Sequence, residues 1–247
     1  MFLSCDIGNS NIKAGLFSGK ELVESYSFQD INQFTGIYSE KEITKTGISS
    51  VVPELTDQVV KFLDDKSFDC YCITPDSAFN VKIKYKTPQT LGTDRICSAE
   101  GAFLLNRKIK SDEILLSIDF GTATTINVVY YPGEFMGGLI APGVKIMGEA
   151  LHNSTAQLPV AGFDDFEEMI GGSTITAVAS GLINATLGMT ERFLAFIQNT
   201  FPTKKIKIFI TGGNAEKIIS RLDFKFIYEK NLVLYGIKAV TDLNSRN

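Results

Sequence analysis

The chain has 247 residues, of which 44% are hydrophobic and 21% are charged. This is the composition of an ordinary globular protein, long enough for one large or two modest domains, and it excludes a disordered chain. Lysine and arginine number 24 against 28 aspartate and glutamate residues, which gives a formal net charge of −4. Because no excess of positive charge attracts a phosphate backbone or an anionic bilayer, we expect neither nucleic acid nor membrane as a partner.

The N-terminus, Met1 to Asp6, has neither the basic region nor the long apolar region of a signal peptide, so we expect the mature chain to begin at Met1. The longest uncharged run, residues 169–190, contains Gly, Ser, Thr and Asn, which indicates a buried helix rather than a membrane span. The four cysteines form no CxxC pair, and His152 is the only histidine in the sequence. We therefore expect a reduced, cytoplasmic protein without structural zinc.

Residues 3–28 predict three strands joined by two turns, the first at Asp6 to Asn9 and the second at Ser18-Gly19. The next segment alternates, with a strand near residues 47–50, a helix over 55–65 and a short buried strand over 68–73. Alternation of strands and helices is typical of α/β folds.

A helix is predicted over residues 95–108, and the charged stretch 106–113 is interpreted as a domain boundary. Residues 115–140 then repeat the pattern of residues 3–28, with an aspartate at the end of the first strand, a glycine two residues later and a hairpin turn about a dozen residues on. The repeat predicts two similar domains, residues 1–110 and 111–247. A long helix within 171–201, a strand and helix over 205–222 and a helix over 231–243 complete the chain.

The repeated corners, at Asp6 and Asp119, indicate a phosphate site. A strand that ends in Asp and is followed by Gly turns with its backbone N–H groups facing outward, a geometry that binds phosphate, while the carboxylate holds a cation or its waters. One such corner is also compatible with a plain β-turn, but the duplication favours two corners that bind a nucleoside triphosphate between them. The sequence contains neither GxxxxGK[ST] nor GxGxxG, so a P-loop or Rossmann site has no support.

Three further elements carry candidate chemistry. Lys13 follows Asp6 on the next strand and is either a phosphate ligand or an edge-strand lysine that faces water. Gly212-Gly213 before Asn214 either lets a base or ribose approach the backbone or is a plain strand-to-helix loop.

The third element is the predicted helix that begins after Asp94. The pair Asp94-Arg95 stands at its start, and Tyr85 lies upstream in the sequence. One interpretation is an acceptor site, in which the carboxylate takes a proton and the guanidinium holds an anionic or hydroxyl-rich substrate. The other is that Asp94 is only the N-cap of the helix.

The segments "DIGNSNIK", "YKTPQTLGTDR", "DFGTATT", "GGLIAPGV", "STAQLP", "GGSTITAVASG" and "FITGGNA" together resemble the type III pantothenate kinases, within the actin, Hsp70 and sugar kinase superfamily. The resemblance covers essentially the whole chain. It implies an α/β fold of two similar actin-like (ribonuclease H-like) domains with an ATP cleft between them. It also implies a transferase that phosphorylates pantothenate to 4'-phosphopantothenate, the first step of coenzyme A biosynthesis.

The resemblance assigns roles to particular residues. ATP would be bound by Asp6, Ile7, Gly8, Asn9, Ser10, Asn11, Ile12, Lys13 and Thr122. Pantothenate would be bound by Tyr85, Gly92, Thr93, Asp94, Arg95 and Thr174, with Asp94 as the general base. Asp119 would bind a monovalent cation, K⁺ or NH₄⁺, alongside the Mg²⁺ that accompanies ATP.

Two positions depart from the family pattern, since Thr93 stands where Ala is frequent and Asn127 where Asp is expected. Small residues in the long helix, among them Ala177 and Gly181, fit a close subunit contact, and the resemblance implies a homodimer. A non-catalytic ATP-binding regulator of the same fold and a kinase for another small alcohol are the alternatives. His152 is expected to be a structural hydrogen-bonding residue.

Overall fold

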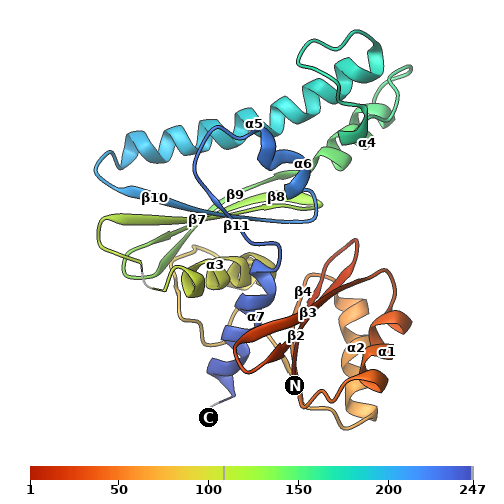
Figure 1. The fold of residues 1–247 in the computed structure, drawn as a ribbon, viewed down its shortest axis with the longest axis vertical. Helices are drawn as coiled ribbons and strands as arrows, with labels where there is room; N and C mark the ends of the chain where they lie inside the picture. The colour runs from red at the N-terminus through yellow and green to blue at the C-terminus, as the bar shows by residue number, and fades with distance from the viewer. Residues whose placement is uncertain (108, 246–247) are drawn as a thin grey trace.

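The structure is a computed structural model that describes residues 1–107 and 109–245, and it contains two twisted sheets (Figure 1). The first sheet has the order β3-β2-β1-β4-β5, with β1–β2 and β2–β3 antiparallel and β1–β4 and β4–β5 parallel. Its strands are β1 (Phe2–Ile7), β2 (Ile12–Ser18), β3 (Glu21–Phe28), β4 (Lys45–Ser50) and β5 (Cys70–Cys72), accompanied by helices α1 (Ile31–Glu40) and α2 (Pro53–Asp65).

The second sheet repeats this topology. Its order is β11-β10-β7-β8-β9-β6, again with the first hairpins antiparallel and the later pairs parallel. The strands are β7 (Glu113–Phe120), β8 (Ala123–Tyr130), β9 (Glu134–Pro142), β10 (Lys205–Thr211), β11 (Ile227–Tyr228) and the added β6 (Lys82–Ile83). The repeat read from the sequence is therefore confirmed as a pair of similar α/β units.

Helices cover both faces of the second sheet. The long helix α5 (Thr174–Thr200) crosses one face, while α3 (Thr93–Leu105) and α7 (Leu232–Asn244) lie between the two sheets (Figure 1). The remaining helices are α4 (Val144–Asn153) and α6 (Ala215–Ile218), with 3₁₀ turns η1 (Pro88–Thr90), η2 (Phe163–Asp165) and η3 (Ile219–Arg221). This two-sided cover explains why β7 reads as a nearly continuous apolar run.

The contact between α3 and α7 brings the end of the chain back to the first sheet. A Cβ at Gly236 would stand 1.8 Å from the carbonyl oxygen of Cys97, so only glycine permits this crossing. Leu234 and Ile237 of α7 then share one apolar cluster with Phe2 and Phe17 of the first sheet. The packing of the C-terminal helix α7 against the first sheet therefore holds the two units together.

Several local expectations need correction. The uncharged run 169–190 is not one buried helix, because α5 begins only at Thr174, and Met169 and Ile170 are 70% and 81% exposed. Two glycines precede Ser173, whose hydroxyl caps the helix by accepting from the Thr176 N–H at 3.4 Å. The strand at 70–72 is an edge strand and is half-buried rather than buried.

Two more helix boundaries differ from the expectation. The helix expected up to residue 222 is a single turn, α6, followed by η3. The helix expected over 95–108 begins earlier, at Thr93, and its predicted end, Lys108, lies outside the described residues, as do residues 246–247 of the second predicted domain. Among the helices that the structure describes, none has the length and apolar character needed to cross a membrane.

Candidate active site

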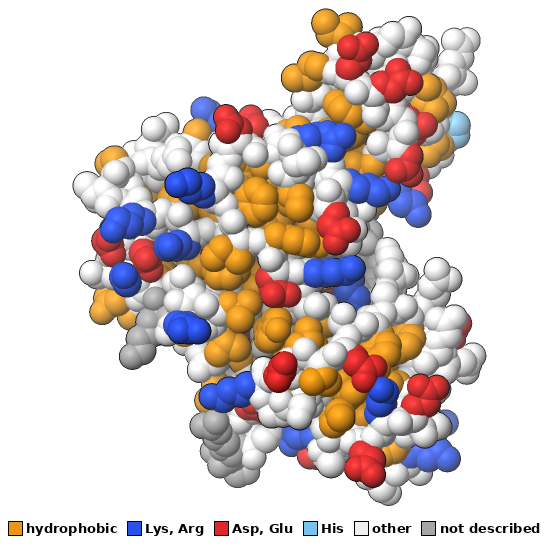
Figure 2. Space-filling model, viewed as in Figure 1, with side chains coloured by type: hydrophobic (Ala, Val, Ile, Leu, Met, Phe, Trp, Pro, Cys, Tyr) orange, Lys and Arg blue, Asp and Glu red, His pale blue; other side chains and the backbone are white. Residues whose placement is uncertain are grey.

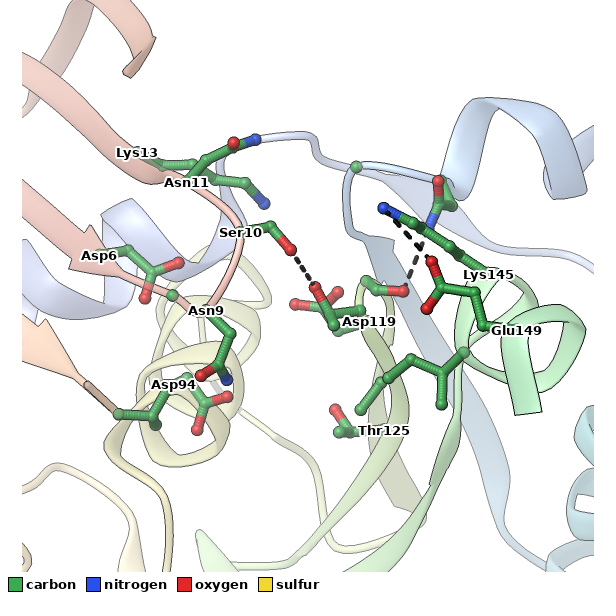
Figure 3. A pocket seen from close by; sticks show the side chains of 18 residues that line it. Asp6, Asn9, Ser10, Asn11, Lys13, Asp94, Asp119, Thr125, Lys145 and Glu149 are labelled. Atoms are coloured by element: carbon green, nitrogen blue, oxygen red, sulfur yellow. Dashed lines mark hydrogen bonds and ion pairs between the residues drawn. The ribbon is translucent and has the colours of Figure 1, made fainter. Parts of the chain in front are cut away.

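A cavity of about 520 Å³ lies between the two sheets, where the corners after β1 and β7 face one another (Figure 3). The molecular surface is hollowed between the upper and lower halves at the right of Figure 2. Residues of both corners line this cavity, together with Asp94 and residues of α4 and of the loop before α6. The two aspartate corners predicted from the repeat are thus brought together.

The first corner is a tight turn between β1 and β2, closed by a hydrogen bond from the Gly8 N–H to the Asn11 carbonyl at 3.1 Å. Asp6 and Lys13 are register partners across β1 and β2. Because β2 lies between β3 and β1, Lys13 is not on an edge strand, and that alternative is wrong. Burial is the main reason why the pKa of Asp6 is raised to about 7. The nearby Lys13 lowers this pKa, and the carboxylates of Asp94 and Asp119 raise it.

The other residues assigned to this corner divide into two groups. Asn9, Ser10 and Asn11 are exposed at the turn and line the cavity. Ile7 and Ile12 are at most 1% exposed and belong to the core of the first unit. The two isoleucines therefore support the turn from the core and do not line the cavity.

The second corner follows β7, where the Gly121 N–H donates to the Ala123 carbonyl at 3.0 Å. The Thr122 hydroxyl lies 2.9 Å from the Ser10 hydroxyl, so the two corners touch. Burial raises the pKa of Asp119 to about 6, with Lys13 lowering it and Asp94 raising it. Three aspartates from three segments therefore influence one another across a single cavity.

Asp119 lines the cavity with the backbone of two glycines close to its carboxylate. A Cβ at Gly212 would stand 2.5 Å from the Asp119 Oδ1 atom, and one at Gly121 would stand 3.0 Å from it, so glycine at both positions lets the backbone approach this oxygen closely. No three His, Cys, Asp or Glu side chains gather as a metal site in the described chain. A divalent ion would thus need further ligands, such as phosphate oxygens.

Asp94 lies in the first turn of α3, and its carboxylate points into the cavity opposite Asp119 (Figure 3). The N-cap is Gly92, so the interpretation of Asp94 as N-cap is wrong. A Cβ at Gly92 would stand 2.5 Å from the Asp94 Oδ1 atom, which explains the glycine. Burial raises the pKa of Asp94, although the Arg95 N–H donates to Oδ1 at 2.8 Å and the Arg95 charge acts in the opposite direction.

Other predicted acceptor residues lie behind Asp94 and do not line this cavity. The Thr93 hydroxyl accepts from Ser49 at 2.9 Å and donates to the Ser50 carbonyl at 3.1 Å, which fastens α3 to β4. The Arg95 guanidinium is buried 5.9 Å from the centre of the Tyr85 ring. The structure thus brings Tyr85 and Arg95 together beside Asp94.

Thr174, which the resemblance assigns to the pantothenate site, lies away from the cavity in this chain. It is the exposed first residue of α5 and does not line the cavity. His152 is also outside the cavity, and its Nδ1 donates to the Leu158 carbonyl at 2.6 Å, the structural role expected of it.

Sequence reasoning missed the contribution of α4. Its residues Lys145 and Glu149 line the cavity, with the two charged groups 3.8 Å apart (Figure 3). The Gly143 N–H donates to the Thr122 carbonyl at 3.0 Å, which seats the start of α4 on the second corner. Gly143, the N-cap residue directly before α4, was the available signal.

Asn214 also acts differently from the expectation. Its side chain makes no capping hydrogen bond in α6, and its Nδ2 donates to the Gly121 carbonyl at 3.1 Å. Gly213 and Asn214 both line the cavity. The Gly-Gly-Asn segment is therefore part of the second corner and not a plain loop.

Two similar sheets with facing Asp-Gly corners define an actin-like, two-lobed protein. A Porphyromonas gingivalis protein assigned as an N-acetylglucosamine kinase has the same fold, with a TM-score of 0.53 and 13% identity over 98% of this chain and 99% of that one. A Campylobacter jejuni protein assigned to the Baf family of transcriptional activators has a TM-score of 0.61 and 20% identity, over 99% of this chain and 100% of that one. At these identities the likeness shows the fold alone.

The family is shown by sequence. The model of the type III pantothenate kinase family matches residues 2–195. A type III pantothenate kinase of Flavobacterium johnsoniae is 33% identical over 247 residues, covering 96% of each chain. The chain therefore belongs to the type III pantothenate kinase family, and by that membership it is a kinase.

Proposed function

We propose that this protein transfers the terminal phosphoryl group of ATP to the primary hydroxyl of pantothenate, giving 4'-phosphopantothenate and ADP, the first step of coenzyme A biosynthesis. The observation that carries the proposal, beside family membership, is that the Asp94 carboxylate shares one cavity with both phosphate corners. A phosphoryl donor and a hydroxyl acceptor would therefore meet in one place.

ATP would bind between the corners. The turn after Gly8 would supply backbone N–H groups, Lys13 would supply a cation from one side, and the Thr122 hydroxyl would supply a hydrogen bond from the other. Lys145 adds a second cation, from the lobe opposite Lys13 (Figure 3). Phosphoryl transfer requires mainly positioning and neutralisation of charge, which this arrangement supplies.

Bound cations complete the charge balance of the cavity. Four carboxylates (Asp6, Asp94, Asp119 and Glu149) and two lysines line it, so a triphosphate would meet net negative charge. Mg²⁺ bound through the phosphates would neutralise part of the charge that develops in the transfer. Asp119, whose carboxylate lines the cavity, would hold K⁺ or NH₄⁺.

Asp94 would be the general base. Its Oδ1 is occupied by the Arg95 N–H, which leaves Oδ2 for the hydroxyl proton of the acceptor. As the hydroxyl oxygen attacks the terminal phosphorus, the bond from that phosphorus to the ADP oxygen breaks and the proton passes to the carboxylate. A pKa raised by burial makes the carboxylate a stronger acceptor of that proton.

The acceptor itself would lie beside Gly92, Asp94 and Arg95, against Tyr85. Its binding site would be completed in a homodimer that forms through the exposed face of α5. Small residues follow this face at Ala177, Gly181, Ala185 and Gly188, and a Cβ at Gly181 or Gly188 would meet nothing within 4 Å. Because Thr174 does not line the cavity of its own chain, its proposed contact with pantothenate requires the partner subunit. We place the enzyme in the cytoplasm.

The test is an ADP-release assay with pantothenate, glucose, N-acetylglucosamine and short hydroxy acids as acceptors, each with Mg-ATP and K⁺. We expect ADP release above background hydrolysis with pantothenate only. Turnover of another alcohol would identify a different kinase. ATP binding without turnover of any acceptor would instead indicate the non-catalytic regulator.

A further inference from the structure

One carboxylate is fully buried outside the cavity. Glu100 lies on α3, is 0% exposed and does not line the cavity. A glutamate is almost never buried in this way unless its charge has partners. Among the ion pairs of residues 1–107 and 109–245, none includes Glu100. Its partners are therefore neutral donors, and the fold keeps the carboxylate for what these donors belong to.

Both oxygens of this carboxylate bind one short segment. The Val81 N–H donates to the Glu100 Oε1 atom at 2.8 Å, and the Asn80 Nδ2 atom donates to Oε2 at 3.0 Å. Burial raises the pKa of Glu100, while the donors on Val81 and Asn80 lower it. The two donor residues directly precede β6, so Glu100 anchors the point at which this strand begins.

The strand β6 needs such an anchor because it has only two residues and lies at the edge of the second sheet. Two hydrogen bonds join it to the neighbouring chain, from the Lys82 N–H to the Gly133 carbonyl at 2.7 Å and from the Lys84 N–H to the Phe135 carbonyl at 2.9 Å. Successive N–H groups of a strand point in opposite directions, so the Val81 N–H faces away from β9. Glu100 supplies the acceptor that this buried N–H requires.

The apolar pattern of this segment does not by itself fix the register of β6. Val81, Ile83 and Tyr85 share one face and join the same apolar cluster, whereas Lys82 and Lys84 are exposed. A shift by one residue would turn the lysines inward and is excluded. A shift by two residues would keep an apolar face inward. Only the bond from the carboxylate to one particular N–H distinguishes the observed register from this alternative.

The register of β6 decides where the Tyr85 ring lies. The ring centre is 6.3 Å from that of Phe135 and 5.9 Å from the central carbon of the Arg95 guanidinium. A Cβ at Gly137 would stand 3.0 Å from the ring, so glycine at this position lets the ring lie directly against β9. A shift of β6 by two residues would displace Tyr85 by about 7 Å along the strand.

We propose that Glu100 is a positioning residue of the acceptor site, because its carboxylate fixes the register of β6 on β9 and thereby holds Tyr85 beside Asp94. The inference rests on the proposed function, in which Tyr85 lies against the acceptor. Glu100 touches neither substrate, and the phosphate corners do not depend on β6. Its loss should therefore weaken acceptor binding and leave the ATP site intact.

The test is Glu100→Met, which removes both acceptor oxygens at similar side-chain length. We expect KM for pantothenate to rise by about fivefold to thirtyfold, the effect of losing one contact with the acceptor, while KM for ATP and kcat stay within about twofold. Amide hydrogen exchange over residues 79–86 should become faster, because the segment loses its anchor. Asn80→Ala removes only one of the two hydrogen bonds and should raise KM for pantothenate by about twofold to fivefold.

A double-mutant cycle tests whether Glu100 acts through Tyr85. Tyr85→Ala should raise KM for pantothenate by itself, but in the Glu100→Met background it should add no more than about twofold. The same cycle with Asn80→Ala, in which the added effect of Tyr85→Ala should be smaller than its effect alone, decides the question if Glu100→Met does not fold.

Asn244→Ala is the matched control for general loosening of this part of the chain. The Asn244 amide binds the Ala78 N–H and carbonyl, each at 2.9 Å, two residues before Asn80. We expect the variant to lower Tm and to leave KM for pantothenate within about twofold, because Glu100 still anchors β6.

Three results would overturn the inference: an unchanged KM for pantothenate in Glu100→Met and Asn80→Ala, effects that multiply in the cycle, or an equal rise of KM in Asn244→Ala. A wild-type enzyme that does not use pantothenate would instead overturn the proposed function. In that case hydrogen exchange over residues 79–86 still decides whether Glu100 holds β6, since exchange that is no faster in Glu100→Met would refute that role.

Discussion

The hydroxyl groups of Ser10 and Thr122, 112 positions apart in the sequence, lie 2.9 Å from each other and join the two corners across the cavity. Each hydroxyl can donate or accept, so both can turn to phosphate oxygens when a triphosphate enters. We therefore expect bound phosphates to separate the two hydroxyls. Each hydroxyl then hydrogen-bonds the nucleotide instead of the other hydroxyl.

Thr122→Val tests this exchange, because it removes one hydroxyl at nearly constant shape. A nucleotide at 100 times its dissociation constant stabilises a protein by about 2.7 kcal/mol. We expect the increase in Tm produced by Mg-ATP to be much smaller in the variant than in the wild type. Melts without nucleotide control for the effect of the substitution on the fold. Equal ATP-induced increases would mean that the hydroxyl serves only the turn.

Asp94→Asn tests the general base. The amide keeps the size of the side chain but cannot accept the proton, and loss of a general base costs about 10²- to 10⁴-fold in kcat. We expect this loss with a Tm that does not fall below that of the wild type, because the amide removes a buried charge, and with an unchanged ATP-induced increase in Tm. A variant with near wild-type turnover would reduce Asp94 to a structural residue of α3.

Cation dependence tests Asp119. Turnover with Mg-ATP should require K⁺ or NH₄⁺, with Na⁺ a poor substitute, and Asp119→Asn should remove this dependence together with most of the activity. Initial rates in buffers that differ only in the monovalent cation provide the measurement. Identical turnover in Na⁺ and K⁺ would contradict the assignment of Asp119 to a monovalent cation.

The pH dependence of stability tests Asp6. Burial raises its pKa from 3.8 to about 7 in the folded protein. Stability from this group is therefore complete below about pH 3.8 and is lost as the pH rises to about 7. In metal- and nucleotide-free protein, Asp6→Asn should raise the free energy of unfolding by on the order of 1 kcal/mol at pH 8, less than the full linkage value because Asp6 lines an open cavity.

The same substitution should have little effect at pH 4, where the wild-type carboxyl is protonated in the folded state. Urea unfolding at both pH values provides the comparison. A destabilised Asp6→Asn protein at pH 8 would show that the carboxylate is stabilised in the fold by interactions stronger than its burial.

Lys145→Met tests the part of the cavity that α4 supplies. Because the ammonium group faces the space between the corners, we expect KM for ATP to rise by about fivefold to twentyfold, as expected for loss of a partly exposed charged contact, with KM for pantothenate unchanged. Lys217→Met is the matched control, since Lys217 also forms an exposed ion pair, with Asp164 at 2.9 Å, but does not line the cavity. Equal effects of the two variants would exclude a specific role for Lys145.

Local sequence determined most of the strands and both corners. Alternating apolar residues and turns with Asp and Gly are signals that lie within about ten neighbouring residues, and the duplication of Asp6-x-Gly8 at Asp119-x-Gly121 made the topology of the second sheet predictable from the first. The Asp94-Arg95 pair was also recognisable, because both residues stand together in the chain.

Only the tertiary structure decided which distant side chains meet. Lys145 reaches the cavity because Gly143 seats α4 on the second corner, and Arg95 lies behind Asp94 because β8 and β9 bring Asn127 and Phe135 around it. The return of α7 to the first sheet likewise depends on the close crossing at Gly236. These contacts follow from which apolar faces pack together, a property of the whole chain that no short segment encodes.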